Sequence, residues 1–161
     1  MSLAQARQVS EGLYPHQVEG LAFLLGRKRS ILADDMGLGK TRQSILAFSH
    51  ADSGGPYLVL CPASVKLNWQ REIAMVLPEA KTHIVGPAPP PAPGFDGWVI
   101  LNYDILGKHL EALLTHNWVG IAFDEAHYLK NHRSQRSRFA RTLVDRTAGD
   151  PVVHALTGTP L

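Results

Sequence analysis

A glycine-containing turn between an apolar run and a helical pattern, within residues 30–49, is the feature that most restricts the fold of this chain. Gly37 and Gly39 in the turn carry no Cβ, so the backbone can approach a bound phosphate closely. Lys40 can place a positive charge near the β- and γ-phosphates of a nucleotide, and the Thr41 hydroxyl can ligate Mg²⁺. The pattern predicts a phosphate-binding loop, with the start of the helix adding its positive dipole end.

The turn departs at one position from the usual phosphate-loop pattern. Asp34 stands where that pattern has its first glycine. Gly-Lys-Thr alone arises often by chance, so the loop needs support from a second motif. The residues predicted to hold the nucleotide here are Asp35, Met36, Gly37, Leu38, Gly39, Lys40 and Thr41.

An acidic motif follows a second apolar run. Residues 119–123 fit a buried parallel strand, and the sequence Asp-Glu-Ala-His comes directly after them. Asp124 is suited to hold the Mg²⁺ shell, Glu125 to orient or deprotonate the attacking water, and His127 to link the site to moving parts. Acidic residues also favour a solvated helix start. Combined with the loop and its Lys40, however, the motif predicts ATP or GTP hydrolysis.

Two further segments allow two interpretations each. Residues 156–160 follow a strand-like run, and their hydroxyls either couple the nucleotide state to a neighbouring lobe or belong to an ordinary turn. Near the start of the chain, Gln17 precedes an apolar helical stretch. Gln17 either reads the adenine edge with its paired donor and acceptor or lies on a helix surface.

Together and in this order, these segments resemble the first motor lobe of superfamily 2 helicases, and most closely the Swi/Snf-type DNA translocases. An aspartate at the position of Asp34 is normal in that family. The resemblance covers residues 13–161, which leaves residues 1–12 as an amino-terminal extension. The sequence of residues 102–106 favours the branch that includes HARP-like annealing helicases. The matching segments are residues 14–17, 34–41, 58–69 with Glu72, 102–104, 124–131 and 156–160.

The resemblance implies a RecA-like α/β lobe that uses ATP and Mg²⁺, with Gln17 at the adenine and with Thr41 and Asp124 at the metal. It implies that double-stranded or forked DNA is the partner. A second RecA-like lobe, absent here, then supplies an arginine finger, so this lobe alone is expected to hydrolyse ATP little or not at all. The residues expected to contact DNA are Ser64, Asn102, Lys130 and Asn131.

Composition fits one soluble domain. The chain has 161 residues, of which 45% are hydrophobic and 19% charged, so it can bury a core. Cys61 is the only cysteine, which excludes an internal disulfide, and its place after an apolar run predicts a buried thiol. No segment reaches the roughly 20 apolar residues that a membrane span needs. We expect the cytoplasm, with nucleoid association, in a prokaryote or phage, and the nucleus in a eukaryote.

Charge is unevenly distributed. The net charge is +2, but residues 126–149 carry six basic residues and one acidic residue. A basic helix in this region either approaches the phosphates of DNA or forms a solvated face. The eight histidines show no ligand-type spacing, and we expect most of them at the surface or at helix ends.

Strand-like and helical patterns alternate along the chain. This alternation predicts a parallel sheet with helices on both faces and a ligand site at the carboxyl ends of the strands. Ser64 is the expected N-cap of its helix. Trp69 is either a core residue, which we expect, or a platform on which bases stack. The prolines of residues 87–93 predict a stiff connection in place of a crossover helix. We expect strands over 30–33, 57–61, 81–85, 98–102, 119–124 and 152–157, and helices over 15–25, 40–49, 64–77, 105–114 and 134–144.

Two other classes of protein compete with a motor lobe. One is a truncated, non-catalytic module that binds nucleotide or DNA. The other is a P-loop kinase or GTPase, which fits poorly because residues 124–127 and 156–160 have no role there and no guanine-reading segment is apparent.

Overall fold

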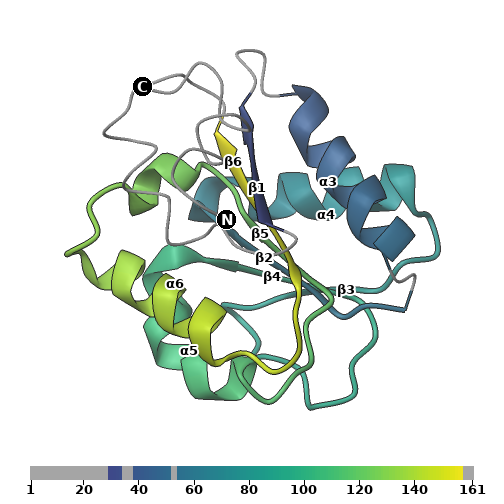
Figure 1. The fold of residues 1–161 in the computed structure, drawn as a ribbon. Coiled ribbons are helices and arrows are strands. Elements are labelled where there is room, and N and C mark those ends of the chain that lie inside the picture. The colour runs from purple at the N-terminus through teal and green to yellow at the C-terminus, as the bar shows by residue number, and fades with distance from the viewer. Residues whose placement is uncertain (1–28, 34–37, 52–53, 158–161) are drawn as a thin grey trace.

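The computed structural model describes residues 29–33, 38–51 and 54–157. Within these ranges, six strands form one sheet in which every neighbouring pair is parallel, in the order β1-β6-β5-β2-β4-β3 (Figure 1). The expected strands are confirmed to within one residue at each end. The strands are β1 (Arg29–Ala33), β2 (Tyr57–Cys61), β3 (Thr82–Ile84), β4 (Trp98–Asn102), β5 (Gly120–Phe123) and β6 (Val152–Thr157).

Helices cover both faces of the sheet. In Figure 1, α3 and α4 lie on one face and α5 and α6 on the other, and each pair packs together. Three short 3-10 turns follow the carboxyl ends of β2, β4 and β5. The helices are α3 (Leu38–Ala51), α4 (Lys66–Val76), α5 (Leu106–Leu113) and α6 (Gln135–Arg146), and the turns are η2 (Ala63–Val65), η3 (Tyr103–Ile105) and η4 (Ala126–Leu129).

Strand β2 explains why the apolar runs of this sequence are continuous rather than alternating. Leu58 and Leu60 belong to the core cluster beneath α5 and α6, whereas Tyr57, Val59 and Cys61 belong to the cluster beneath α3 and α4. Successive residues of a strand face opposite sides of the sheet, so one apolar run fills both cores. Full burial of each such aliphatic side chain stabilises the fold by about 1.5–3 kcal/mol.

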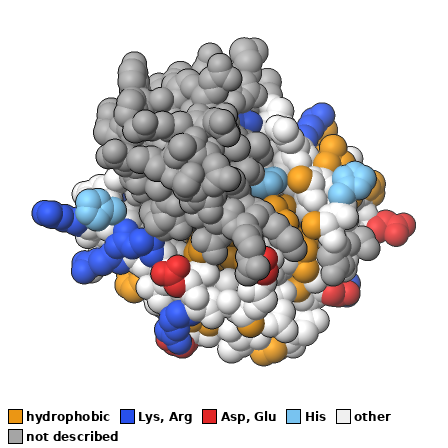
Figure 2. Space-filling model, viewed as in Figure 1, with side chains coloured by type: hydrophobic (Ala, Val, Ile, Leu, Met, Phe, Trp, Pro, Cys, Tyr) orange, Lys and Arg blue, Asp and Glu red, His pale blue; other side chains and the backbone are white. Residues whose placement is uncertain are grey.

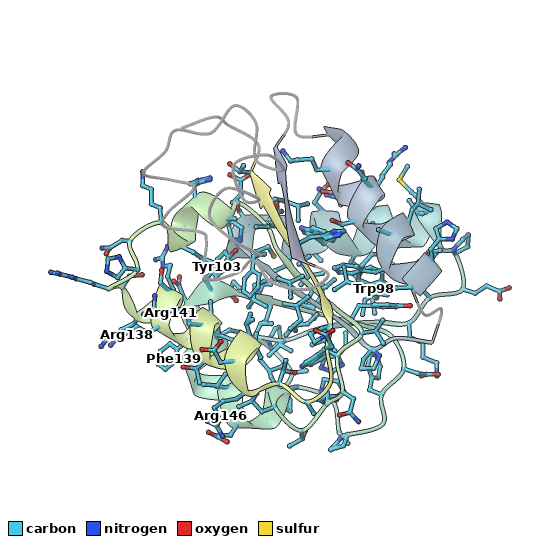
Figure 3. All side chains as sticks on the ribbon, in the orientation of Figure 1. Trp98, Tyr103, Arg138, Phe139, Arg141 and Arg146 are labelled. Atoms are coloured by element: carbon cyan, nitrogen blue, oxygen red, sulfur yellow. The ribbon has the colours of Figure 1, made fainter. Side chains whose placement is uncertain are left out.

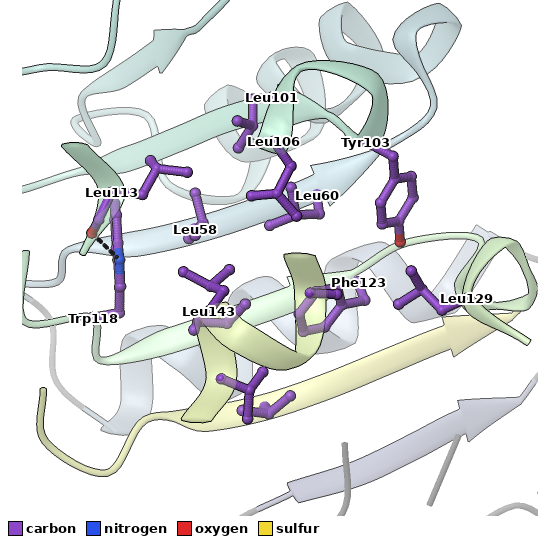
Figure 4. Packing of buried hydrophobic residues seen from close by; sticks show 14 of the residues in the cluster. Leu58, Leu60, Leu101, Tyr103, Leu106, Leu113, Trp118, Phe123, Leu129 and Leu143 are labelled. Atoms are coloured by element: carbon purple, nitrogen blue, oxygen red, sulfur yellow. Dashed lines mark hydrogen bonds between the residues drawn. The ribbon is translucent and has the colours of Figure 1, made fainter. Parts of the chain in front are cut away.

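The helices on the second face bury regular apolar stripes. Leu106, Leu110 and Leu113 lie three or four positions apart on α5 and join the cluster with Leu143 of α6 (Figure 4). Figure 4 also shows the indole of Trp118, whose Nε1 donates to the carbonyl of Leu113 at 2.9 Å. Helices α5 and α6 therefore cover the second face of the sheet with their apolar stripes.

The two serines at helix starts behave differently. Ser134 is the N-cap of α6, and its Oγ accepts a hydrogen bond from the backbone N of Ser137 at 3.2 Å. Ser64, however, lies inside η2, and the N-cap of α4 is Val65, which makes no side-chain capping bond. The predicted N-cap role of Ser64 is wrong, because the 3-10 turn delays the start of the α-helix.

The proline-rich stretch connects β3 to β4 without a helix, as expected. Two histidine side chains hold it: His83 Nε2 lies 2.7 Å from the carbonyl oxygen of Pro89, and His116 Nε2 lies 3.0 Å from that of Pro91. His116 is only 2% exposed and His154 only 7%. These two are exceptions to the expected surface positions of the histidines.

Candidate nucleotide and magnesium site

The topology brings the two chemical motifs to one edge of the sheet. Because all the strands run parallel, their carboxyl ends share that edge. Helix α3 is the next described element after β1, and Asp124 follows β5. Strand β6 lies between β1 and β5, with Ala33 opposite Thr157 and Phe123 opposite Ala155 (Figure 1). The end of β1 and the start of the acidic motif after β5 therefore lie on either side of the end of β6.

Lys40 lies in the first turn of α3, beside Gly39 and Thr41. Its side chain is buried, with 4% exposed, and its Nζ donates to the backbone carbonyl of Thr157 at 2.7 Å. Burial is the main influence on the Asp124 carboxyl and raises its pKa, and the positive charge of Lys40 acts in the opposite direction. Two groups that lie far apart in the sequence thus share one electrostatic environment at the carboxyl edge.

Asp124 is held firmly in place. Its Oδ2 accepts from Nε1 of Trp69 at 2.8 Å, and its Oδ1 accepts from the backbone N of Glu125 at 2.9 Å. Burial raises the pKa of the Asp124 carboxyl above its ordinary value, and the Trp69 hydrogen bond is the largest effect in the opposite direction. Each carboxylate oxygen keeps acceptor capacity beyond these bonds, so the group can still bind a metal or a water.

Glu125 adopts a backbone conformation that is rare for a residue with a side chain. Its φ and ψ are both 50°, in the left-handed region, and among the described residues it is the only non-glycine with positive φ. Such conformations are held at a cost and occur often at functional sites. The turn brings Glu125 Oε2 to 3.5 Å from Nε2 of His127. The Nδ1 of His127 is buried and has no hydrogen-bond partner among the described residues.

The donor set fits Mg²⁺ bound together with a nucleotide. Mg²⁺ prefers oxygen ligands and is commonly held by one or two carboxylates plus substrate phosphates and waters. Asp124 offers a carboxylate and Thr41 a hydroxyl, and both are oxygen ligands. Within the described ranges, His, Cys, Asp and Glu do not gather in threes to form a closed metal cage, which a phosphate-assisted site does not require.

Two of the predicted DNA-contact residues line a common pocket. Ser64, exposed on η2, and Asn102, at the end of β4, border a hollow of about 270 Å³ that Tyr103, Tyr128 and Arg136 also line. Asn102 is 8% exposed. Its Oδ1 accepts a hydrogen bond from Nζ of Lys66 at 3.0 Å. The polar end of Asn102 is therefore already engaged by the protein.

The other two predicted DNA-contact residues, Lys130 and Asn131, are exposed in the turn after η4. Asn131 Oδ1 accepts from the backbone N of Arg133 at 3.1 Å. In Figure 2, basic side chains gather on the left, on the side that carries this turn and α6, with an acidic side chain beside them. This surface is basic but does not consist of basic residues alone.

The arginines of α6 have different neighbours. Arg136 lies 5.1 Å from the ring centre of Tyr128 and 3.6 Å from the carboxylate of Asp104, whereas Arg146 pairs with Glu111 at 3.1 Å. Arg138 and Arg146 lie near opposite ends of the helix (Figure 3). The basic set therefore does not form one continuous face.

Several predicted residues cannot be placed. Gln17, Asp35, Met36 and Gly37 lie outside the described residues, as do residues 158–160. Leu38 opens α3. For these positions the sequence predictions stand as predictions.

The sequence predictions missed three polar contacts around the site. Trp69 was expected in the core, and it is fully buried, but its bond to Asp124 has no local sequence signal. The Tyr103 hydroxyl donates to the backbone carbonyl of Asp124 at 2.6 Å. Ser44 Oγ and His154 Nδ1 lie 2.8 Å apart, linking α3 to β6. Each contact joins residues far apart in the chain, which periodicity cannot reveal.

The parallel sheet, its two helical layers and the site at its carboxyl edge define a RecA-like α/β lobe. Residues 16–161 match the profile of the SNF2-related domain, and the chain belongs to that family. The resemblance to Swi/Snf-type proteins is thereby confirmed. No helix in the described ranges is both long and apolar enough to span a membrane.

Relatives and a solved structure support this assignment. A Caenorhabditis elegans homologue of the SWI/SNF-related regulator of chromatin subfamily A-like protein 1 is 33% identical over 93% of this chain and 22% of its own length. The Saccharomyces cerevisiae ISWI chromatin-remodeling complex ATPase ISW1 is 34% identical over 95% of this chain and 15% of its own length. The Sulfolobus solfataricus SWI2/SNF2 ATPase core in complex with dsDNA shares 28% identity, with a TM-score of 0.65, over 99% of this chain and 35% of that one.

The chain therefore spans 22% and 15% of the lengths of these two relatives. The two relatives have different names but nearly equal identity to this chain. The assignment to a HARP-like branch consequently stays a prediction.

Proposed function

We propose that this chain is the ATP-binding lobe of an ATP-dependent translocase that acts on double-stranded or forked DNA. The observation that carries the proposal is the placement of two groups at one carboxyl edge: Lys40, bonded to the Thr157 carbonyl at the end of β6, and Asp124, directly after the neighbouring strand β5. A buried ammonium and a partly buried carboxylate at the carboxyl edge of a parallel sheet suit a nucleoside triphosphate with its metal.

Each side chain in the site has a distinct proposed role. Lys40 contacts the β- and γ-phosphates in exchange for its present bond to the Thr157 carbonyl. Thr41 and Asp124 hold Mg²⁺, which when bound neutralises charge that develops on the phosphates. Glu125 orients or deprotonates the attacking water, and His127, 3.5 Å away, relays the state of the site to its surroundings.

Hydrolysis and movement on DNA require more than this lobe. We propose that a second RecA-like lobe completes the site with an arginine, as in other phosphoryl-transfer motors. DNA then lies along the side of the lobe that carries Ser64, Asn102, Lys130 and Asn131. The Sulfolobus core, solved in complex with double-stranded DNA, supports this proposal through its similar fold.

The test uses the longest natural protein that contains this chain. ATP hydrolysis is measured without DNA and with double-stranded, single-stranded and forked DNA. The expected result is hydrolysis that double-stranded or forked DNA stimulates. Glu125→Gln is expected to bind ATP as the unsubstituted protein does and to lose hydrolysis, because an amide cannot accept the proton from water.

The competing possibilities give different results. Binding of ATP or DNA without hydrolysis in the natural protein would indicate a non-catalytic module. A preference for GTP over ATP in direct binding would instead indicate the GTPase class and would overturn the proposal.

A further inference from the structure

Asp124 is held by two side chains from the elements that follow β2 and β4. Trp69, on α4, donates its indole N–H to Asp124 Oδ2 at 2.8 Å. Tyr103, on η3, donates its hydroxyl to the Asp124 backbone carbonyl at 2.6 Å. One contact orients the carboxylate and the other fixes the main chain that carries it.

Both donor side chains, Trp69 and Tyr103, are packed in the core. Trp69 is 0% exposed and Tyr103 is 3% exposed, and each belongs to one of the two core clusters. The indole N–H is a donor only, so burial without an acceptor would cost about 1–3 kcal/mol. Packing therefore holds the Trp69 side chain in place. Because its buried N–H needs an acceptor, the same packing favours the position of the Asp124 carboxylate that accepts from it.

We propose that Trp69 and Tyr103 are positioning residues that hold Asp124 in the geometry needed for Mg²⁺–nucleotide and tie that geometry to the DNA-facing segments. This inference rests on the proposed function. Groups that orient a metal ligand commonly affect metal affinity by about 10- to 100-fold without touching the metal.

The link to DNA follows from where the two donors are attached. Helix α4 follows directly after η2, which carries Ser64, and Tyr103 follows directly after Asn102. Ser64, Asn102 and Tyr103 line the same hollow of about 270 Å³. A nucleic-acid backbone that enters this hollow therefore contacts η3, which holds the Asp124 carbonyl, and η2, which leads directly into the helix that holds the Asp124 carboxylate.

An aromatic contact also joins η3 to the turn that follows the acidic motif. The rings of Tyr103 and Tyr128 stack with centroids 5.8 Å apart, and Tyr128 lies in η4, just after Glu125 and His127. A shift of η3 therefore acts on both ends of the acidic turn, through the Asp124 carbonyl and through Tyr128.

Trp69→Phe is the sharpest test in this chain, because it removes the N–H donor and keeps an aromatic ring. Trp98→Phe is the matched control: Trp98 is 1% exposed and lies in the same core cluster, but packs against Phe48 and Tyr57. Affinity for a fluorescent ATP analogue is measured on the 161-residue chain with and without Mg²⁺, below the melting temperature of every variant.

Trp69→Phe is expected to weaken the Mg²⁺-dependent affinity by about 10-fold and to leave the Mg²⁺-free affinity nearly unchanged. Trp98→Phe is expected to change neither. Tyr103→Phe provides a second variant in the natural protein: DNA affinity is expected to persist while stimulation of hydrolysis by DNA falls by about 10-fold or more.

The outcomes separate the two proposals. If the unsubstituted chain shows no Mg²⁺-dependent nucleotide binding, the proposed function fails and this inference fails with it. If that binding is present but Trp69→Phe behaves like Trp98→Phe, the proposed function survives and the positioning role is overturned. The role of Tyr103 in coupling is overturned if Tyr103→Phe retains full DNA stimulation.

Discussion

His154 gives the fold a calculable dependence on pH. Its ring is 7% exposed and its centroid lies 4.8 Å from that of Phe48, while its Nδ1 is 2.8 Å from Oγ of Ser44. Burial disfavours the charged imidazolium and lowers the pKa of His154 from 6.5 to about 4. The unfolded chain therefore takes up a proton at this residue at a higher pH than the folded chain does.

The free energy of unfolding follows from that difference. Above pH 6.5 neither state is extensively protonated at His154, so its full contribution to stability is present. As the pH falls from 6.5 toward 4, the unfolded state gains the proton first and stability is lost. Since one pKa unit corresponds to about 1.4 kcal/mol, the loss is about 2 kcal/mol near pH 5 and approaches roughly 3 kcal/mol near pH 4.

Urea unfolding at about pH 7.5 and about pH 5 measures this loss. His154→Asn keeps a hydrogen-bonding atom near the position of Nδ1 but does not titrate, so it is expected to remove about 2 kcal/mol from the pH dependence. Ser44→Ala keeps the buried imidazole. We expect the loss of stability that it causes at about pH 7.5 to equal the loss that it causes at about pH 5. An unchanged pH dependence in His154→Asn would refute the reasoning.

Three further substitutions test the packing around the site by the same unfolding measurement. Gly120→Ala places a Cβ 2.7 Å from the ring of Phe48 and is expected to destabilise the fold by about 1–3 kcal/mol; an unchanged stability would mean that the ring moves freely. Phe48→Ala empties a fully buried position and is expected to cost about 3–5 kcal/mol, and a loss below about 1 kcal/mol would contradict the described core. Arg42→Ala breaks a pair with Glu72 in which the Arg42 side chain is 52% exposed, so the expected loss is below about 1 kcal/mol; a larger loss would indicate a structural role.

The strands and the layer order were predictable from the sequence because parallel strands are buried on both faces. Continuous apolar runs such as residues 57–61 and 98–101 are typical of strands that are buried on both faces. The placement of Lys40 and Asp124 at one edge of the sheet also followed from topology, since α3 follows β1, Asp124 follows β5, and the carboxyl ends of these strands share that edge. The strands follow from local sequence pattern, and the position of the site follows from the rule that the carboxyl ends of parallel strands share one edge.

The contacts that complete the site were not predictable in the same way. The bond from Trp69 to Asp124 spans 55 positions, and the one between Ser44 and His154 spans 110. Each depends on side-chain packing across two elements, which residue types and spacing do not encode. The misplaced N-cap at Ser64 has a local cause: a 3-10 turn precedes α4 and uses the same residues.

The most direct test of the central claim is the affinity of the chain for ATP in the presence of Mg²⁺, measured by calorimetry on Lys40→Ala. Lys108→Ala, an exposed lysine on α5, is the matched control. Loss of one charge-assisted contact to phosphate corresponds to about a 10- to 100-fold weaker affinity. We predict that loss for Lys40→Ala and an unchanged affinity for Lys108→Ala. Equal affinities in the two variants would contradict a phosphate site at the end of β6.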